Sequence, residues 1–339
     1  MDPVIVCVDV MGGDREPQVV LDGIVAALEA DSSIKVLASG PEELVVPFAQ
    51  DRERVEALIA PEVITMEDDP IQAVLTRRKS SIVLGCRAVK KGNAHAFFSA
   101  GASGAVAAAA TAYVTPFKYV DGDKVKPVRP ALTSALPNMA GGETVLSDMG
   151  ANPDVEPMDM VHFGQMAHSY AKLVLGVSEP RVGLLSNGTE DGKGNEFVKA
   201  CYPLMKEYVP GFVGNREGGD VVNGSVDVMI ANGFDGNIAL KSFEQSAKFL
   251  MGELKVAFSS SLLTKLAALI MKPKMREIKN RFNSDNIGGA ILLGLKGVVF
   301  IGHGATSVNA VKNGILSSAS CVRANLVEEI ANSLENIRA

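Results

Sequence analysis

The hydrophobic positions of this chain fall into short continuous runs, and each run ends in a loop rich in Gly, Ser and Asn. The first run covers residues 4–8 and precedes Asp14 and Pro17, two residue types that often begin a helix. Apolar residues at helical spacing then occupy positions 20–28, and a second apolar run covers 34–38. This pattern predicts a strand, a helix and a second, parallel strand joined in the right-handed sense.

Continuous rather than alternating apolar strands indicate a sheet that is covered on both faces. We therefore expect an α/β fold, a three-layer α/β/α sandwich with a mostly parallel, Rossmann-like sheet. No linker is long enough to force a domain boundary. The sequence predicts a single domain over residues 1–339, from which residues 258–282 protrude.

The junction of strand, small-residue loop and helix recurs along the chain. It is found at residues 4–14, 96–104, 145–152, 226–237 and 298–304. In a parallel sheet such loops lie outside the carboxyl ends of the strands, where ligands bind. They aim backbone N–H groups and a positive helix end at one spot, which suits a phosphate or another anion.

Three other segments need an interpretation. Residues 94–114 contain no acidic or basic residue apart from His95, but their Ala, Gly and Ser content favours a buried strand and helix over a membrane span. Residues 119–130 carry charges and prolines and are expected to form a surface excursion. In residues 287–299, Lys296 and several glycines interrupt an apolar stretch, which we interpret as a packed core helix leading into a strand.

The segment 258–282 combines an apolar stripe with a strongly basic character. The stripe consists of Leu262, Leu263, Leu266, Leu269 and Ile270, and the basic residues are Lys265, Lys272, Lys274, Arg276, Lys279 and Arg281. Such a composition suits a helix pair on an anionic membrane surface. An amphipathic helix that packs against the body or a second subunit fits equally well. Pro273 should interrupt the segment and give two short helices with an exposed tip.

The composition and the net charge of the chain argue against several classes of function. The 339 residues are 47% hydrophobic, with a net charge of −6 and a pI near 5.4, which argues against a general nucleic-acid binder. The four cysteines are scattered without a CxxC pair, which suits a reducing cytoplasm and offers no zinc site. The histidines show no metal-ligand spacing, so neither a metal nor another cofactor is expected. The N-terminus lacks the basic region of a secretory signal.

Two motifs in the first third of the chain are candidate anion sites. Gly12, Gly13 and Asp14 could admit an anion against a helix end, or they could form only a tight turn capped by Asp14. The run Arg77-Arg78-Lys79-Ser80-Ser81 places three cations before two hydroxyls at an expected helix start. It could hold a phosphorylated partner or substrate, or be a solvated basic turn.

Two further loops carry small or charged residues. Ser99, Gly101, Ser103 and Gly104 lead into an Ala-rich helix, where hydroxyls and N–H groups could bind phosphate, although close helix packing requires the same small residues. Lys193 lies between glycines after an expected strand and can reach toward a shared cleft, unless it is a solvated loop lysine.

The last two junctions of strand, loop and helix, residues 226–237 and 298–304, contain a side-chain amide and an imidazole as candidate site groups. Asn237 lies at an expected helix start, where it could stabilise an oxyanion or act as a simple N-cap. His303 lies between glycines after a strand and is the histidine with an obvious cleft position. His162 and His168 fall on a helical run and are expected to pack or face solvent. A GxGxxG pattern is missing after the first strand, which disfavours an oxidoreductase.

Taken together, these motifs resemble one family, the PlsX-type phosphate acyltransferases of bacterial phospholipid synthesis. The matching pieces are Asp9-Val10-Met11-Gly12-Gly13-Asp14 with Pro17, Lys79-Ser80-Ser81, Ser99-Ala100-Gly101 with Gly104-Ala105, Arg129-Pro130-Ala131, Asp148-Met149-Gly150-Ala151-Asn152, Arg181-Val182-Gly183-Leu184-Leu185, Lys193-Gly194-Asn195-Glu196, Gly233-Phe234-Asp235-Gly236-Asn237 with Leu240-Lys241, and Gly302-His303-Gly304. They occur in family order over nearly the whole chain. The resemblance implies a fold like that of isocitrate dehydrogenases and phosphotransacetylases.

The resemblance also implies a reaction and its residues. A long-chain acyl group passes from acyl carrier protein to inorganic phosphate, and the acyl phosphate feeds a membrane glycerol-phosphate acyltransferase. Carried over to this chain, Lys193 would hold phosphate or the developing charge and Asn237 would bind the carbonyl oxygen. The residues expected to bind substrate or phosphate are Gly12, Gly13, Asp14, Lys79, Ser80, Ser99, Gly101, Ser103, Gly104, Asp148, Asn152 and His303.

The implied partners follow from the same resemblance. They are acyl carrier protein, a second copy of the chain in a homodimer, and a membrane surface contacted through residues 258–282. The implied location is cytoplasmic, peripherally attached to the inner face of the cell membrane. The basic segment could also dock the acidic carrier protein.

The chain departs from the family pattern at two loops. Where the family usually has Gly-Asn-Thr-Gly, this chain has Gly101-Ala102-Ser103-Gly104 and so lacks one amide. The stretch 187–192 before Lys193 is less acidic than usual.

Three other functions compete. A short-chain acyl-CoA phosphotransacylase has similar fold and chemistry, but the apolar helical tip favours a long-chain substrate. A non-enzymatic peripheral membrane protein could recruit acyl carrier protein through residues 258–282. An oxidoreductase of the isocitrate dehydrogenase type shares the expected fold but lacks a convincing nicotinamide pocket here.

Overall fold

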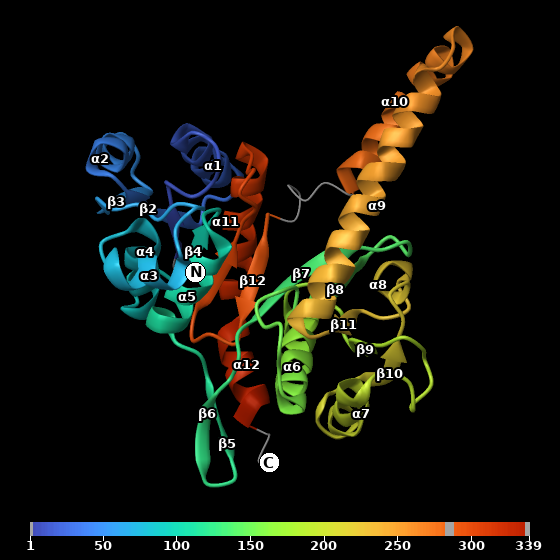
Figure 1. Cartoon of the computed structure of the whole chain (residues 1–339). Helices are drawn as coiled ribbons and strands as arrows, with labels where there is room; N and C mark the ends of the chain where they lie inside the picture. Colours follow the sequence, from blue (N-terminus) through green and yellow to red (C-terminus); the bar gives the residue numbers. More distant parts are fainter. Residues whose placement is uncertain (1–2, 282–287, 336–339) are drawn as a thin grey trace.

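A computed structural model describes residues 3–281 and 288–335 and places 11 strands in one sheet (Figure 1). The strand order is β10-β9-β11-β8-β7-β12-β13-β4-β1-β2-β3, and a separate two-stranded sheet joins β5 and β6. All neighbours in the large sheet are parallel except at β8-β7-β12-β13. Helices cover both faces, so the prediction of a three-layer, mostly parallel α/β sandwich is confirmed.

The elements of the first half are β1 (Val4–Asp9), α1 (Pro17–Ala30), β2 (Ile34–Gly40), α2 (Glu42–Gln50), β3 (Val55–Ile59), α3 (Pro70–Thr76), α4 (Ser81–Lys90), β4 (Ala96–Ser99), α5 (Ser103–Ala109), the π-helix η1 (Ala110–Val114), β5 (Lys118–Asp121), β6 (Lys124–Pro127), β7 (Ala131–Pro137) and β8 (Glu143–Ser147). Those of the second half are α6 (Pro157–Leu173), β9 (Val182–Leu185), α7 (Glu196–Tyr208), β10 (Phe212–Arg216), α8 (Asp220–Asn223), β11 (Val228–Ile230), α9 (Gly233–Ser259), α10 (Leu262–Arg281), β12 (Ala290–Leu293), β13 (Val298–Ile301), α11 (Val308–Arg323) and α12 (Leu326–Glu335).

The sheet consists of two parallel blocks that run in opposite directions. Strands β13, β4, β1, β2 and β3 form one block, and β8, β11, β9 and β10 form the other. The direction reverses because β7 and β12 lie between the blocks, antiparallel to their neighbours. The strands β7 and β12 therefore separate two sets of carboxyl-end loops that belong to different blocks.

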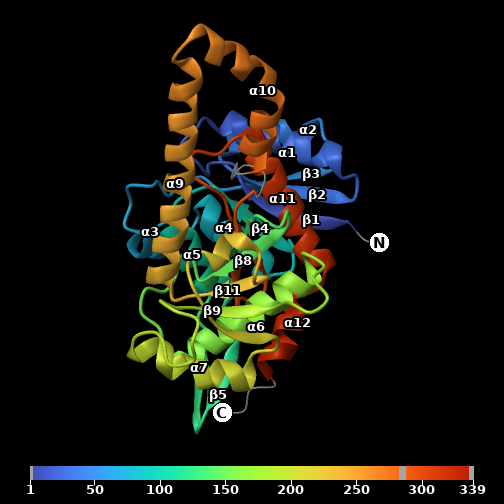
Figure 2. The same cartoon turned by 90° about the vertical axis from the view of Figure 1, so that its right-hand side faces the viewer.

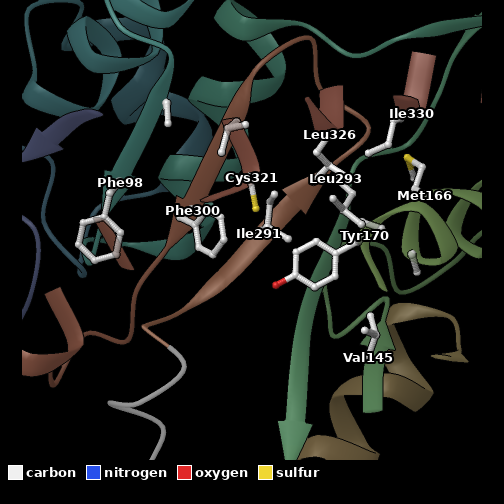
Figure 3. Close-up of a cluster of buried hydrophobic side chains, with 14 of the residues drawn as sticks. Phe98, Val145, Met166, Tyr170, Ile291, Leu293, Phe300, Cys321, Leu326 and Ile330 are labelled. Atoms are coloured by element: carbon white, nitrogen blue, oxygen red, sulfur yellow. The ribbon is translucent and has the colours of Figure 1, made fainter. Parts of the chain in front are cut away.

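The core explains why the strands are continuously apolar. Successive residues of a strand point to opposite faces of the sheet. In β4, Phe98 joins the cluster beneath α1, α11 and α6, whereas its neighbour Phe97 joins the cluster beneath α4 and α5. Figure 3 shows the first cluster, in which Phe98 of β4 and Phe300 of β13 come from one block of the sheet, Val145 of β8 comes from the other block, and Tyr170 comes from α6. Burial on both faces is therefore what requires apolar residues at consecutive positions.

Several local predictions are confirmed. Residues 4–9 and 34–40 form the parallel pair β1 and β2, connected through α1, which begins at Pro17. Residues 94–114 contain β4, α5 and η1. Residues 118–127 form the β5–β6 hairpin, which stands away from the large sheet (Figure 1). All four cysteines are buried as free thiols.

The prediction of a core helix within residues 287–299 is wrong. Residue 287 lies outside the described residues, and the following residues form the antiparallel strands β12 and β13. Gly294 has a φ of +93° at the connection, a backbone conformation that favours glycine and that permits the reversal. A short apolar run is compatible with either helix or strand, and this one is too short to be assigned from its periodicity.

The protruding segment exists, but its boundaries and its turn differ from the prediction. Figure 2 shows α9 rising out of the body and α10 returning beside it. The chain reverses between Ser259 and Leu262, whereas Pro273 lies inside α10. We therefore find one helix of 27 residues and one of 20 residues instead of two short helices. Pro273 removes one backbone donor, but the helix is exposed, so water can satisfy the free carbonyl.

Across residues 3–281 and 288–335, no helix combines the length and the apolar content that a membrane crossing needs.

His162 of α6 is an unusual buried group. Its side chain is fully buried, and neither ring nitrogen has a hydrogen-bond partner among the described residues. The ring packs edge-to-face against Tyr119 of the β5–β6 hairpin, with 4.4 Å between ring centroids. Burial lowers the pKa of His162 to about 4. The neutral imidazole therefore packs as an apolar ring, as expected for a histidine on this helical run.

We predict that His162 makes folding sensitive to mild acid. In the unfolded chain its pKa returns to about 6.5, so the unfolded state binds a proton first as the pH falls. The contribution of His162 to the free energy of unfolding is fully present above pH ~6.5 and declines toward pH ~4. At pH ~5 the loss is about 2 kcal/mol. The variant His162→Phe should lack this pH-dependent loss of stability. Urea unfolding of the wild-type protein and the variant at pH ~7.5 and ~5 would measure the difference. Equal pH dependence of the two proteins would contradict the prediction.

Candidate active site

A cavity of about 670 Å³ lies where the two blocks of the sheet meet. Its floor is the face of β7 with Ala290, the first residue of β12, and the two glycines before it, and one wall is the start of α9. The other wall consists of loops that follow β1, β4 and β13. The lining residues used below are Asp14, Met66, Ser103, Leu132, Leu136, Met149, Gly150, Asn237, Leu240, Lys241, Phe243, Glu244, Ile301 and His303. Loops at the carboxyl ends of both blocks therefore reach one cavity, although the blocks run in opposite directions.

The wall formed by the first block is a set of interlocked backbone loops. Asp14 N donates to Gly304 O at 2.7 Å, and Gly302 N donates to Ser99 O at 2.8 Å. Gly12 lies so close to the loop after β4 that a Cβ atom would come within 2.9 Å of the Gly101 nitrogen. These contacts bring the predicted loops 9–14, 99–104 and 302–304 together. Glycine is needed at Gly12 because the two backbones touch there.

A buried carboxylate ties this wall to the sheet. Asp9, at the end of β1, accepts a hydrogen bond from Ser99 Oγ at 2.7 Å and another from Met11 N at 3.1 Å. Ser99 Oγ in turn accepts from Gly101 N at 3.0 Å. Burial raises the pKa of the Asp9 carboxyl, while the hydrogen bonds to it act in the opposite direction. Ser99 and Gly101 are buried beneath the cavity wall, where they shape the loop.

The polar side chains of this wall that line the cavity are those of Asp14, Ser103 and His303. Ser103 begins α5, and no side chain caps that helix end. The imidazole of His303 is exposed, with Nδ1 accepting from Ala305 N at 3.3 Å. Hydroxyl, imidazole and backbone N–H groups thus converge on one end of the cavity, an arrangement suited to an anion. Gly13 and Gly104 lie in the same loops but outside the lining.

The loop after β8 is organised by Asp148. Its carboxylate accepts hydrogen bonds from the backbone N–H groups of Leu132, Gly150, Ala151 and Asn152 and from the Asn152 side-chain amide. Burial raises the pKa of Asp148, and these hydrogen bonds oppose the shift. Asn152 Nδ2 also donates to Pro130 O at 2.7 Å. Both oxygens of Asp148 and the side-chain nitrogen of Asn152 are thus hydrogen-bonded within the protein, and neither residue lines the cavity.

This loop positions Asn237, the fifth residue of α9. Asn237 Nδ2 donates to Met149 O at 3.1 Å. A primary amide has two N–H groups, so one is left for a ligand in the cavity. Gly150 packs directly on this amide, since a Cβ there would come within 2.9 Å of Asn237 Nδ2. The N-cap of α9 is Asn232, which accepts from Asp235 N at 2.8 Å, so the N-cap alternative for Asn237 does not apply.

Lys241 follows Asn237 by one helical turn and lines the same cavity. Its ammonium lies 2.9 Å from Glu244 Oε2, and about half of its side chain is exposed. Most of the remaining lining is apolar, including Leu132, Leu136 and Phe243. The cavity therefore combines polar groups, Asn237 among them, with an extended apolar surface.

Lys193 is outside the lining. It lies in the loop after β9, on the same edge of the second block as Asn237, because β9 and β11 are parallel neighbours. Its ammonium lies 3.9 Å from Glu190 Oε1, a distance that gives only weak attraction in solvent. The side chain is therefore free to take other positions.

The basic run of residues 77–81 does not line the cavity either. Ser80 caps α4 by accepting from Val83 N, and Lys79 N donates to Glu62 Oε2. Arg77 forms a two-fold hydrogen-bonded ion pair with Asp68, with distances of 2.6 and 2.7 Å. This turn is thus structured by its own contacts, close in sequence to the lining residue Met66.

Met66, Lys241, Phe243 and Glu244 also line the cavity, although no motif in the sequence identified them as site residues. A signal existed for Lys241, because Asn237 and Lys241 are four residues apart at a helix start and so share a face. For Met66 no local signal existed, since it reaches the cavity through the approach of another loop. No group of His, Cys, Asp and Glu side chains suited to a metal ion occurs in the described parts of the chain.

Comparisons with known proteins place the chain in a family. The sequence model of the family described as "Fatty acid synthesis protein" matches residues 4–329. The phosphate acyltransferase of Desulforudis audaxviator is 41% identical, covering 98% of this chain and 97% of that protein. That of Geobacillus thermodenitrificans is 38% identical, covering 97% and 98% of the two chains. The similarity thus extends over nearly the full length of both relatives.

Solved structures with the same fold include two enzymes of low sequence identity. The EutD phosphotransacetylase from Staphylococcus aureus has a TM-score of 0.58 at 15% identity, covering 94% of each chain. A branched-chain phosphotransacylase from Enterococcus faecalis has a TM-score of 0.58 at 12% identity, covering 94% of this chain and 99% of that one. These structures support the expected phosphotransacetylase-like fold. The family match and the extent of identity to its curated relatives show that this chain belongs to the phosphate acyltransferase family that its motifs resemble.

Proposed function

We propose that this protein transfers a long-chain acyl group from the thioester of acyl carrier protein to inorganic phosphate and releases acyl phosphate. The observation that carries the proposal is one cavity that is lined by Asn237, by the loops that carry Ser103 and His303, and by an extended apolar surface. Family membership supports an acyltransferase. The apolar lining supports a long acyl chain and disfavours a substrate as short as acetyl.

The proposed step is a direct displacement. A phosphate oxygen attacks the thioester carbonyl carbon, a C–O bond forms, and the carbonyl oxygen becomes an oxyanion. The C–S bond then breaks, and the thiolate leaves and takes up a proton from solvent. Phosphate is already anionic near neutral pH, so it needs positioning more than a strong base. This chemistry requires no serine or cysteine nucleophile.

Named residues would supply the positioning. We propose that the free N–H of the Asn237 amide faces the carbonyl oxygen, where a preorganised donor stabilises the oxyanion. Ser103, His303 and the uncapped start of α5 would hold phosphate. Leu132, Leu136, Leu240 and Phe243 would contact the acyl chain. The buried residues Asp9, Asp148 and Asn152 would act by holding the loops in place.

The test is acyl phosphate formation by the purified protein. Palmitoyl-acyl carrier protein and phosphate should give a product that hydroxylamine traps, and omission of phosphate should abolish it. Turnover with acetyl-CoA alone would instead favour a short-chain phosphotransacylase. A folded protein that turns over none of these substrates would favour the recruitment function.

We predict that Lys193 and Lys241 both compensate the charge of phosphate. Replacing either lysine should remove a charged hydrogen bond to phosphate. The KM for phosphate should therefore rise about tenfold, and the KM for the acyl donor should change less. Initial rates of Lys193→Met and Lys241→Met over a phosphate series would measure this. Lys248→Met is the matched control, because Lys248 is exposed on α9 outside the cavity. An unchanged KM in Lys193→Met would remove Lys193 from the site.

The partners belong to the same proposal. Acyl carrier protein would present the thioester, and a homodimer is expected from the family resemblance. Residues 258–281 would contact the inner surface of the cell membrane. In this segment the large apolar side chains of Leu262, Leu263 and Ile270 are 81%, 81% and 78% exposed. A membrane glycerol-phosphate acyltransferase would take the product there. Phe282, the last residue of the predicted segment, lies outside the described residues.

A further inference from the structure

The short helix α3 carries two large apolar side chains that are mostly exposed. Ile71 is 63% exposed and Leu75 is 52% exposed. They are four residues apart and so lie on the same face of the helix. The opposite face is buried through Ala73 and Val74, which join the cluster beneath α4 and α5. Apolar side chains that gather on a protein surface often mark an interaction site.

Both ends of α3 are held against the wall of the active-site cavity. At its start, Pro70 packs on Gly104 of α5, where a Cβ atom would come within 3.0 Å of the Pro70 ring. At its end, Arg77 pairs with Asp68 at 2.6 Å and so ties α3 to the preceding loop. That loop contains Met66, which lines the cavity and is 46% exposed. The exposed face of α3 therefore stands beside the cavity.

The chain that forms and follows α3 is strongly basic. Residues 70–91 contain no acidic residue, although the net charge of the whole chain is −6. Their six basic residues are Arg77, Arg78, Lys79, Arg87, Lys90 and Lys91. Asp68 compensates the charge of Arg77, whereas Arg78 and Lys79 are exposed and form no ion pair within residues 3–281 and 288–335. This surface would therefore attract an acidic partner.

The cations lie next to the apolar side chains. Arg78 Nε donates to Leu75 O at 3.1 Å. Arg87 of α4 donates to Arg78 O at 3.4 Å, and its guanidinium stacks over the ring of Tyr113 at 4.6 Å. Two arginines are thus held beside Leu75 without a carboxylate partner among the described residues. We call Met66, Ile71, Leu75, Arg78, Lys79 and Arg87 the α3 surface.

We propose that the α3 surface docks the acidic carrier protein that delivers the acyl thioester to the cavity. This inference rests on the proposed transfer reaction and adds the place where the donor binds. A carrier protein is too large to enter a cavity of about 670 Å³, so its body must bind beside the cavity while its flexible arm extends inside. An apolar centre next to uncompensated cations is the arrangement that recognises an acidic protein surface.

The hairpin of α9 and α10 is the competing basic surface, and its position favours it less. Figure 1 shows α3 and this hairpin on opposite sides of β7 and β12. From Asn237 to Ser259, α9 extends over about 33 Å. A carrier protein bound at the tip of the hairpin would have to bring its thioester back along this length. A carrier protein bound at α3 would adjoin the cavity directly.

The test measures binding of the carrier protein without turnover. Fluorescently labelled carrier protein with its phosphopantetheine arm but no acyl group is titrated with the full-length protein, and its anisotropy is followed at ~50 and ~300 mM NaCl. The variants are Arg78→Glu and Leu75→Ser. Lys206→Glu is the matched charge control, because Lys206 is exposed on α7 and does not line the cavity.

We expect Arg78→Glu to weaken binding about tenfold at low salt and to reduce the dependence of binding on salt. Leu75→Ser should weaken binding about threefold at both salt concentrations, because it removes apolar contact and no charge. Lys206→Glu should bind like the wild type. In the transfer assay, Arg78→Glu should raise the KM for palmitoyl-acyl carrier protein and leave kcat and the KM for phosphate unchanged.

Other outcomes would overturn the proposal. Wild-type affinity in both Arg78→Glu and Leu75→Ser would show that the carrier protein does not contact α3. If Lys265→Glu combined with Lys272→Glu abolished binding and Arg78→Glu did not weaken it, docking would belong to the hairpin. A smaller molecular mass of Leu75→Ser in sedimentation would show that a second copy of the chain covers α3. A wild-type protein that binds no carrier protein would contradict the proposed acyl donor itself, and this inference with it.

Discussion

Replacing Asn237 by alanine should lower kcat for acyl phosphate formation about 100-fold to 1,000-fold and leave the KM values nearly unchanged. The reason is that the free amide N–H would contact the carbonyl oxygen most strongly after it has become an oxyanion. Loss of one such donor costs about 3 to 4 kcal/mol of transition-state stabilisation. Steady-state rates with palmitoyl-acyl carrier protein, measured over a phosphate series, would separate kcat from KM.

The control for this prediction keeps the shape of the side chain. Asn237→Asp preserves the size but replaces the N–H donor by a carboxylate oxygen, which repels both phosphate and the oxyanion. It should therefore be no more active than Asn237→Ala. Thermal unfolding must show that both variants are folded, since Asn237 also bonds to Met149 O. Wild-type kcat in folded Asn237→Ala would exclude Asn237 from the chemistry.

The layers of the fold could be predicted because burial on both faces leaves a direct mark on the sequence. Runs such as residues 4–8 must be continuously apolar, and the loops after them must contain small residues where backbones touch, as at Gly12. The strands of residues 290–301 could not be recognised in this way. Each is only four residues long, and a short apolar run carries too little periodicity to exclude a helix.

The candidate site was predictable in part for a similar reason. Asn237, Ser103 and His303 each lie shortly after the end of a strand, at a junction with a helix, so local sequence identifies them. Met66 and Phe243 enter the cavity only because two blocks of the sheet meet across β7, an arrangement set by long-range strand pairing. Local sequence also cannot tell a ligand-binding polar residue from one that holds a loop. Asp148 illustrates this, because its acceptor positions are filled by the backbone of its own loop and of β7.

Substituting Gly236 by alanine is predicted to cause the largest loss of stability at the site. The added Cβ would overlap the carbonyl oxygen of Asp148. That oxygen cannot easily move, because the Asp148 side chain fixes its loop through several hydrogen bonds, including 2.7 Å from Asn152 N. The start of α9 must shift instead, at a cost of about 3 kcal/mol. Urea unfolding would measure this loss, and activity should fall with it because Asn237 is the next residue.

Gly252 provides the matched control on the same helix. A Cβ at Gly252 would meet no heavy atom within 4 Å, and Gly252 is exposed in the middle of α9. Gly252→Ala should therefore stabilise the protein by about 0.5 to 1 kcal/mol, because alanine is the better helix former. The two substitutions are chemically identical, so their opposite effects would isolate the contact with Asp148. A stability of Gly236→Ala equal to that of Gly252→Ala would mean that the α9 start is not held against the β8 loop, and the geometry proposed for Asn237 would fail with it.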